Sequence, residues 1–451
     1  MKSATIVGAG LVGSLWAVYL SKAGYKVTVV ERRPDIRKAE ITAGKSINLA
    51  LSTRGWKALD MVGVGDEIRK IAIPMHGRIM HDLEGNLSYQ PYGQEGQAIY
   101  SVSRGDLNAK MMTIAEEVGN AEIRYNEKCE NVDLENGIVY LKNSITGEKS
   151  EVQSDLVFAT DGAFSAVRYN AMQKVDRFNF SQQYIADGYR EILLPANEDG
   201  THKLKKNALH IWPRGRFMLI ALPNEDGSFT CTLFMPFEGD KNSFENLKTR
   251  DQVDRFFKTT FPDFFELMPN VADAWEDHPL SSLALIRCFP WTHGKTVLMG
   301  DAAHATVPFY GQGMNCGFED CSVMWELMQE YREDWDAIFK AFEKSRKPNC
   351  DSMQNLSLHN YHVMRDFVAD PQFLLQKKLE RKMEEYYPEE YLPLYSMVTF
   401  SNVDYAEAEK RGKEQDERIK KIMSLNDIEA LFETGEIDDL IHQFFIQLSH
   451  A

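Results

Sequence analysis

The sequence predicts an α/β protein that combines a dinucleotide-binding part, an antiparallel β-sheet and a C-terminal helical region. Three observations support this prediction. A glycine-rich strand–turn–helix opens the chain, short strands separated by Asn, Asp and Gly turns fill residues 176–278, and helical periodicity dominates after residue 322. With 451 residues, the chain is long enough for two or three domains, each with its own core.

Composition narrows the range of partners. The formal net charge of −16 argues against nucleic acid and against an anionic membrane surface. The six cysteines show no CxxC spacing, which is typical of reduced thiols in a cytoplasmic protein and not of zinc ligands or disulfides. A strand within the first residues leaves no room for a signal peptide, and no apolar run reaches the roughly 20 residues of a membrane span.

The N-terminus has the full pattern of a Rossmann-like βαβ unit. Strand-like residues at 4–7 lead into the motif GAGLVG, and a helix and a second strand follow, which ends at Glu31. Gly8 permits a tight turn, Gly10 lets a pyrophosphate approach the backbone, and Gly13 lets helix and strand pack closely. Glu31 falls where an acid meets a ribose hydroxyl. The pattern therefore predicts dinucleotide binding, the alternative being a glycine-rich turn without a ligand.

A second motif lies far along the chain, in the segment VLMGDAAHATVPFYGQGMNCGFED at 297–320. It combines a buried strand, the acidic Asp301, a loop that contains Gly311 and Gly313, and a helix from Met314. Asp301 can accept a hydrogen bond from a sugar-chain hydroxyl, and the N–H groups at the helix start can face an electron-rich ring edge. One N-terminal fingerprint followed by this segment favours an extended FAD over NAD.

Four other charged residues are candidates for cofactor contacts. Arg54 or Lys45 could approach phosphate or flavin, although a surface role is as compatible with the composition. Arg104 stands at a helix start, where it can pair with a phosphate or lie on the surface. Asp161 ends a buried strand and is expected to cap the next helix, whether or not it also faces the cofactor.

The antiparallel sheet is expected from strands at 189–194, 208–212, 217–222 and 229–234. Met218, Ile220 and Leu222 alternate along one strand, and Thr232 and Phe234 along the next, so each set shares one face of the sheet. This face is either simple core or the wall of an apolar pocket. Helices are expected beyond it, at 322–330, 335–344, 350–367, 371–386, 404–424, 427–432 and 437–448.

These motifs together resemble the group A flavoprotein aromatic hydroxylases along nearly the whole chain. GAGLVG, DGAFSAVR and GDAAHATVPFYGQGMN are similar to signatures of the whole family. KSINLALSTRG, YSVSRGDLN and HIWPRGRFMLIALPNEDGSFTCTLFMP are similar to the branch that acts on kynurenine. The tail lacks the membrane-anchoring segment of eukaryotic members, so a soluble, bacterial-type member is expected.

The resemblance implies a Rossmann-like FAD-binding domain of the aromatic hydroxylase type, interrupted by a substrate domain. The implied FAD-binding domain comprises residues 1–70, 98–175 and 279–345. The substrate domain comprises strands at 71–97 and the antiparallel sheet at 176–278, and residues 346–451 form the C-terminal helical region.

The resemblance also implies a reaction. Such enzymes bind one FAD, NADPH reduces it, and O2 then gives a flavin C4a-hydroperoxide that oxidises an electron-rich ring. The implied substrate is L-kynurenine and the product 3-hydroxykynurenine. The alternatives are a hydroxylase of another aromatic amine or acid, and an FAD-holding protein without turnover; a flavin halogenase is disfavoured because its WxWxIP pattern is missing. A homodimer is compatible with the sequence, and no metal is expected.

The same resemblance assigns residues to FAD and to the substrate, with no side chain as acid or base. His304 is expected to be structural, and the contact of Tyr310 stays open. Arg78 would bind the substrate carboxylate together with Tyr92, Asn360 and Tyr395. The ring pocket would comprise Met218, Ile220, Leu222, Thr232, Phe234, Pro308 and Phe309. FAD would contact Gly8, Gly10, Leu11, Val12, Gly13, Glu31, Arg32, Leu49, Arg104, Asp161, Gly300, Asp301, Pro308, Gly311, Gly313, Met314 and Asn315.

Overall fold

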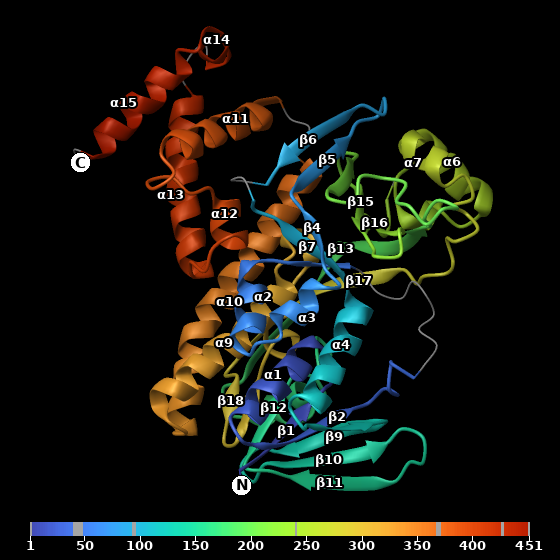
Figure 1. The fold of residues 1–451 in the computed structure, drawn as a ribbon, viewed down its shortest axis with the longest axis vertical. Coiled ribbons are helices and arrows are strands. Elements are labelled where there is room, and N and C mark those ends of the chain that lie inside the picture. The colour runs from blue at the N-terminus through green and yellow to red at the C-terminus, as the bar shows by residue number, and fades with distance from the viewer. Residues whose placement is uncertain are drawn as a thin grey trace.

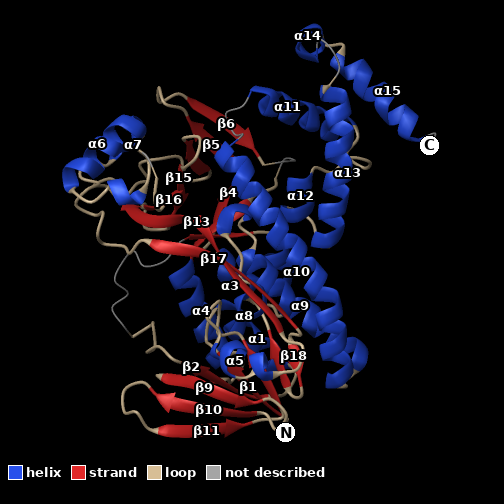
Figure 2. Cartoon of the chain, turned by 180° about the vertical axis from the view of Figure 1, so that it is seen from behind, coloured by secondary structure: helices blue, strands red, loops and turns tan. Residues whose placement is uncertain are grey.

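The computed structural model describes residues 2–38, 48–92, 96–239, 241–366, 371–424 and 428–449. Lys45, one of the candidate phosphate contacts, lies outside them. The molecule is elongated (Figure 1), with the N-terminal sheet and the small antiparallel sheet of residues 127–153 at one end. The seven-stranded sheet and the C-terminal helices lie side by side at the other end, in both views (Figures 1 and 2).

The N-terminal sheet has six strands in the order β18-β19-β12-β1-β2-β8, parallel except for β18. Its central strands are continuous apolar runs because helices and further sheets cover both faces. Helix α1 (Leu11–Lys22) connects the first two strands, which confirms the predicted βαβ unit. The strands are β1 (Ser3–Val7), β2 (Lys26–Glu31), β8 (Glu122–Tyr125), β12 (Leu156–Ala159), β18 (Thr292–His293) and β19 (Thr296–Leu298).

Two small sheets and four helices complete this part of the molecule. The sheets are β3 (Asn48–Leu51), β7 (Ile99–Ser103) and β4 (Ile73–Met75), and β9 (Glu127–Asp133), β10 (Ile138–Asn143) and β11 (Lys149–Gln153). The helices are α2 (Thr53–Met61), α3 (Gly65–Arg69), α4 (Arg104–Glu117) and α5 (Ala166–Asn170), with a short 3-10 turn at Met172–Lys174.

The predicted antiparallel sheet is confirmed, with one parallel pair between β14 and β5. Its seven strands run in the order β17-β13-β16-β15-β14-β5-β6. They are β5 (Gly77–His81), β6 (Leu87–Pro91), β13 (Asn179–Leu194), β14 (Leu209–Pro213), β15 (Met218–Pro223), β16 (Phe229–Pro236) and β17 (Ser281–Phe289). A 3-10 turn at Phe244–Asn246 and helices α6 (Arg250–Thr260) and α7 (Pro262–Leu267) pack over one face and form a core with it.

The two faces of β15 and β16 have different partners. Leu219 and Leu233 point into the core under α6 and α7. Met218 lies opposite Phe234, and Ile220 opposite Thr232, on the other face. The predicted sharing of a face by these residues is therefore confirmed, and this face lies away from the core under α6 and α7.

The C-terminal part is helical, as predicted, with one correction. The helices expected at 335–344 and 350–367 form a single helix, α10 (Trp335–Asp366), with Pro348 inside it. Proline removes one helical hydrogen bond, but α10 packs on both α9 and α13, and these contacts hold the helix together. The other elements are α8 (Asp301–His304), a 3-10 turn η3 (Pro308–Tyr310), α9 (Gly313–Tyr331), α11 (Pro371–Tyr386), α12 (Leu394–Thr399), α13 (Tyr405–Met423), α14 (Ile428–Thr434) and α15 (Ile437–Ser449).

Figure 2 shows α10 running from beside α9 towards the seven-stranded sheet, so one helix joins the two halves of the molecule. Helix α12 was not predicted, because its six residues are too few to show a helical period. Within the described ranges, no helix is both long enough and apolar enough to cross a bilayer.

A buried histidine pair links the seven-stranded sheet to α7. His81 Nδ1 lies 2.6 Å from Asp263 Oδ2, and His81 Nε2 lies 2.9 Å from His210 Nδ1. His210 Nε2 lies 3.0 Å from the Lys205 carbonyl, to which it must donate. Burial lowers the pKa of His210 to about 4, so His210 is neutral at pH 7 and accepts at Nδ1.

This pair predicts a pH-dependent stability. Because the folded pKa of His210 is about 4 and its ordinary value is 6.5, the unfolded chain binds a proton first as the pH falls. The contribution is complete above pH 6.5 and is lost towards pH 4, to the extent of about 3 kcal/mol. His210→Gln, which cannot titrate, should reduce the fall in unfolding free energy between pH 7 and pH 4.5. Urea unfolding of both proteins at the two pH values measures the two free energies. An equal fall in unfolding free energy in His210→Gln and in the unaltered protein would contradict the prediction.

Candidate active site

The glycine-rich turn after β1 has the geometry that a dinucleotide requires. Gly8 has φ of +101°, where other residues are strained, and a Cβ on Gly13 would lie 2.1 Å from the Gly8 carbonyl oxygen. A Cβ on Gly10 would meet nothing within 4 Å. Gly8 and Gly13 are thus required by the fold itself, whereas Gly10 faces free space. Leu11 and Val12 start α1 directly behind this turn.

Glu31 ends β2 beside the turn and is buried. Its Oε2 accepts from the Ala9 N–H at 2.9 Å, and its Oε1 accepts from Arg33 N at 3.0 Å and Arg33 Nε at 2.8 Å. Burial opposes ionisation, but the bonds from Arg33 and Ala9 outweigh it and hold the pKa of Glu31 below its ordinary value. A carboxylate at this place can also accept a ribose hydroxyl.

The second motif approaches the first at Gly300. This residue has φ of +59°, and a Cβ on it would lie 3.0 Å from Val12 Cγ2. Asp301 follows as the first residue of α8 and is exposed. The close approach of Gly300 and Val12 places Asp301 near the glycine-rich turn, where its exposed carboxylate can bind a polar chain.

The loop between α8 and α9 is fixed by Asn315. Asn315 Oδ1 accepts from the Ser52 N–H at 2.9 Å, and its Nδ2 donates to the carbonyls of Ala50 and Gly311, also at 2.9 Å. Gly311 has φ of +67°, and a Cβ on it would stand 3.4 Å from Ala50 Cβ. Strand β3 and the start of α9 are thus held as one unit. Gly313, Met314 and Leu49 are half-buried parts of this unit.

A buried network of charges underlies these elements, and the sequence did not reveal it. Arg54 Nη1 binds Glu319 Oε1 at 2.5 Å, and Arg346 Nη1 binds Glu319 Oε2 at 2.6 Å. Arg346 Nε binds Asp320 Oδ1 at 2.8 Å, and Asp320 Oδ2 lies 2.7 Å from His304 Nε2. Asp320 Oδ2 also accepts the Gly300 N–H at 2.8 Å. The network therefore fixes the turn that carries Asp301.

The sequence-based interpretation of Arg54 as a surface residue was wrong. Its guanidinium is fully buried, so it is not a surface residue, and it is occupied by Glu319 and by the Tyr405 ring, 4.0 Å away. It is therefore not free for a phosphate. His304 was expected to be structural, and its contact with Asp320 inside the buried network agrees with that expectation.

Asp161 is not the N-cap of α5, because Ser165 takes that position and accepts from the Arg168 N–H at 3.0 Å. Asp161 Oδ2 nonetheless accepts from the Ala166 N–H at 2.6 Å. Its Oδ1 is buried and has no hydrogen-bond partner within the described part of the chain. Burial raises the pKa of Asp161. An unpartnered buried acceptor beside Gly8 suits a site that a polar ligand completes.

Arg32 and Arg104 are both exposed, and the structure gives neither an ion-pair partner among the residues it describes. The two glycine-rich turns approach each other at Gly300 and Val12, with open space at Gly10 and the exposed carboxylate of Asp301 nearby. These features fit an extended dinucleotide such as FAD.

The different surroundings of the glycines allow a test. Gly10→Ala should leave the thermal unfolding of the apoprotein unchanged but weaken FAD binding at least tenfold, because its methyl group would occupy the space left for the pyrophosphate. Gly13→Ala should lower the unfolding temperature as well, since its methyl group meets the Gly8 carbonyl. Flavin fluorescence titration and calorimetry separate the two effects. Full FAD affinity in Gly10→Ala would contradict the assignment.

Arg78 stands in a cage of tyrosines. Its guanidinium carbon lies 5.1 Å from the ring centres of both Tyr92 and Tyr395, which stack on each other at 5.6 Å with 11° between their planes. Tyr310 stacks on Tyr395 at 5.8 Å. Among the described residues, no carboxylate pairs with Arg78. Burial opposes its charge, but Tyr395 and Tyr92 hold the pKa of Arg78 above its ordinary value.

A half-buried guanidinium that has no counter-ion among the described residues favours an anionic ligand, because an unpaired charge is costly where it is partly shielded from water. Tyr92 Oη is also buried and makes no hydrogen bond of ordinary geometry within the described residues. Burial raises the pKa of Tyr92, so its hydroxyl stays protonated and can donate. The cage can thus hold a carboxylate by charge and by a hydroxyl donor.

An apolar wall adjoins this cage. Phe234 and Phe309 have ring centres 5.0 Å apart, and Phe309 and Tyr361 have theirs 4.7 Å apart. Met218 belongs to the same cluster, with Ile220 packed against it. Asn360 Nδ2 donates to the Phe309 carbonyl at 2.6 Å, so its described contact is with η3.

Leu222 packs with Tyr92 in a neighbouring cluster that Ile220 also touches. Thr232 is buried opposite Ile220, and Pro308 begins η3. The structure thus brings all the predicted substrate residues to one face of the sheet or to the helices that cover it.

Two aromatic residues at this site were not assigned from the sequence. Tyr310 completes the cage around Arg78, and Phe400 packs beside Tyr92 at 6.2 Å. No local pattern distinguishes them from core residues. The turn η3 joins the two sites, because Phe309 belongs to the wall, Tyr310 to the cage, and Gly311 follows on the cofactor loop.

Comparisons with known proteins agree with this geometry. A family model described as FAD binding domain matches residues 1–357. The chain is 51% identical over 437 residues to a kynurenine 3-monooxygenase of Flavobacterium johnsoniae, covering 97% of both chains. It is 40% identical over 440 residues to a kynurenine 3-monooxygenase of Dictyostelium discoideum, covering 94% of both.

Solved structures show the same fold. A tetrameric 2-methyl-3-hydroxypyridine-5-carboxylic acid oxygenase superposes with a TM-score of 0.67 at 19% identity, over 82% of this chain and 94% of the other. The p-nitrophenol 4-monooxygenase of Pseudomonas putida superposes with a TM-score of 0.63 at 18% identity, over 97% and 99%. With its full-length match to the curated relatives, the chain belongs to the kynurenine 3-monooxygenase family of FAD-binding aromatic hydroxylases.

Proposed function

We propose that this protein is an FAD-dependent monooxygenase that converts L-kynurenine to 3-hydroxykynurenine with NADPH and O2. One observation carries the choice of substrate class: a half-buried Arg78 that has no carboxylate partner among the described residues and lies beside an apolar aromatic wall. L-kynurenine has an α-carboxylate at one end and an electron-rich aniline ring at the other. Family membership supports the same substrate.

In this proposal, each group of residues has one task. Arg78 and Tyr92 bind the carboxylate, while Tyr395 and Tyr310 stack around the guanidinium and keep water from it. Met218, Phe234 and Phe309 form the surface on which the ring lies. Bound FAD, once reduced by NADPH, supplies the oxygen-activating chemistry. The apolar wall excludes water from the side of the site on which the ring lies.

The cofactor would lie along the two glycine turns. Gly10 leaves room for the pyrophosphate, Glu31 accepts a ribose hydroxyl, and Asp301 accepts from the sugar chain. The N–H groups at Gly313 and Met314 would face the electron-rich edge of the ring system. We also propose the division into an FAD-binding domain at 1–70, 98–175 and 279–345, a substrate domain, and the helical region from 346.

The test begins with the purified protein. It should be yellow, and L-kynurenine should accelerate its NADPH oxidation and yield 3-hydroxykynurenine, identified by mass spectrometry. Acceleration by another aromatic amine or acid, but not by kynurenine, would instead support the second candidate, a related hydroxylase. A yellow protein that oxidises no NADPH with any of these compounds would refute both.

We further propose a cytoplasmic protein that forms a homodimer. The first point is supported by six buried cysteines, all present as free thiols. Sedimentation analysis at several concentrations tests the second.

A further inference from the structure

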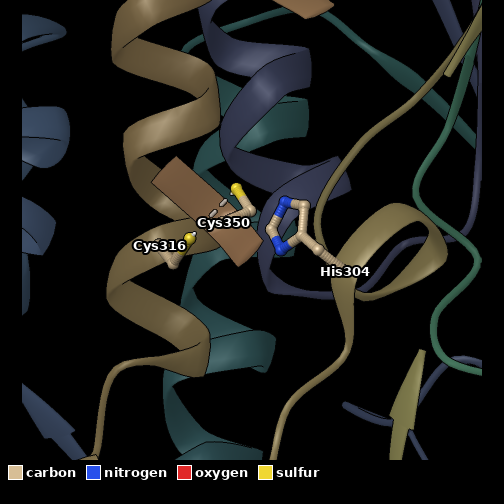
Figure 3. A group of neighbouring side chains, drawn as sticks. All are labelled: His304, Cys316 and Cys350. Carbon is tan, nitrogen blue, oxygen red and sulfur yellow. Dashed lines mark hydrogen bonds between the residues drawn. The ribbon is translucent and has the colours of Figure 1, made fainter. Parts of the chain in front are cut away.

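The buried core between α9 and α10 contains two thiols that face each other (Figure 3). Cys316 Sγ and Cys350 Sγ are 3.5 Å apart, and both side chains are fully buried. His304 lies beside them, with its ring within 4.8 Å of both sulfur atoms. The four other cysteines are also buried, and none of them has such a partner in the described residues.

The surroundings of Cys316 favour a thiolate. Arg346 Nη2 lies 3.3 Å from Cys316 Sγ, and Cys350 can donate its S–H to the same atom. Burial opposes ionisation, but the Cys350 bond and the positive charges of His304 and Arg346 lower the pKa of Cys316. Burial and the neighbouring Cys316 raise the pKa of Cys350. The pair therefore consists of one nucleophilic sulfur and one protonated sulfur.

The position of the pair points to its oxidant. Cys316 directly follows Asn315, the residue that fixes the cofactor loop to β3. If the protein has the function proposed above, oxygen is reduced at this loop, and a turnover that misses the substrate releases hydrogen peroxide there. A molecule of that size reaches a buried sulfur through small local openings.

We propose that Cys316 and Cys350 are a peroxide-oxidisable thiol pair, which hydrogen peroxide converts to a disulfide that joins α9 to α10. The Cys316 thiolate attacks one peroxide oxygen, the O–O bond breaks, and hydroxide leaves, giving a sulfenic acid. Cys350 gives its proton to the hydroxide, and its sulfur then attacks Cys316, so that an S–S bond forms and the S–O bond breaks. The S–O oxygen leaves as hydroxide and takes up from solvent the proton that the Cys316 thiol released on ionising, which gives the second water. Two thiols and one peroxide become one disulfide and two waters.

A metal ion is the alternative occupant of this cluster, and the contacts argue against it. Arg346 places a positive charge 3.3 Å from Cys316 Sγ, where it repels a cation. Asp320 raises the pKa of His304 despite its burial, and a protonated ring has no lone pair for a metal.

The first experiment adds hydrogen peroxide to the folded protein and then alkylates free thiols under denaturing conditions. The expected result is that Cys316 and Cys350 escape alkylation and are recovered as a linked peptide pair. The mass of this pair should be two hydrogens below the sum of the two free-thiol peptides. Cys350→Ala should instead trap a sulfenic acid on Cys316, which dimedone labels. Cys316→Ala should give neither product, while Cys321→Ala, a buried thiol on the same helix, should behave like the unaltered protein.

The proposal is overturned if Cys316 and Cys350 are recovered as free thiols after peroxide treatment, if another cysteine reacts first, or if the purified protein holds a stoichiometric metal that Cys316→Ala abolishes. A second experiment replaces added peroxide by NADPH and air, with catalase in solution. Disulfide formation there supports an internal source of peroxide. If only added peroxide works, the thiol chemistry stands, and the source assigned through the proposed function is wrong.

Discussion

Arg78→Leu is expected to raise the KM for L-kynurenine about 10- to 150-fold while the FAD content stays that of the unaltered protein. The variant removes the only charge that the cage offers to the carboxylate, and a hydrogen-bonded charge pair contributes about 1.5–3 kcal/mol. Arg78 lies on β5 in the seven-stranded sheet, not on the glycine turns, so flavin binding should be unaffected. Steady-state kinetics and the flavin absorbance measure the two quantities.

A substrate analogue supplies the control. Kynuramine has the same aromatic ring but lacks the α-carboxylate, so the unaltered protein should bind it weakly and Arg78→Leu should bind it equally weakly. The loss of affinity from removing the substrate carboxylate and the loss from removing the Arg78 side chain should therefore not add. If Arg78→Leu weakens the binding of kynuramine and of kynurenine by the same factor, or if it releases FAD, the carboxylate is bound elsewhere.

Arg346→Met is expected to lower the free energy of unfolding by about 3–5 kcal/mol, because it leaves buried carboxylates without their partner. Arg346 binds both Glu319 and Asp320, and its own side chain is 2% exposed. In this variant Asp320 would still pair with His304, and Glu319 would still pair with Arg54. The loss of stability should therefore be smaller than that from removing the whole network. Urea unfolding with FAD in excess measures the change.

The neighbouring lysine is the matched control. Lys347 pairs with Asp351 one turn along α10, with 22% and 32% of the two side chains exposed. Lys347→Met removes the same charge from the same helix but should cost less than about 1 kcal/mol. Equal losses in the two variants would mean that the buried network has no special role.

The cofactor turns were predictable from the sequence because their requirements are local. A strand, glycines at fixed spacing and a terminal acid define one βαβ unit, and the structure has that unit with Glu31 bound to the turn. The alternation of Met218, Ile220 and Leu222 likewise follows from the pleat of a strand and was confirmed.

The charge network was not predictable because its members come from four separate helices, α2, α8, α9 and α10. Arg54, Glu319 and Arg346 each have an ordinary local sequence, and only the packing of α2, α9 and α10 makes them partners. The same reason explains the misinterpretation of Arg54. The separation of the helices expected at 335–344 and 350–367 was wrong for the opposite reason, since tertiary packing keeps α10 continuous through Pro348.

The turn η3 has a consequence for altering this protein. Phe309 of this turn belongs to the apolar wall, and Tyr310 stacks on Tyr395. Gly311, which follows the turn, accepts a hydrogen bond from Asn315. Shortening Phe309 should therefore also disturb the loop that Asn315 anchors, so a broader substrate range is expected to come with less efficient use of oxygen. Remodelling from the strand side, at Met218 or Phe234, escapes that coupling.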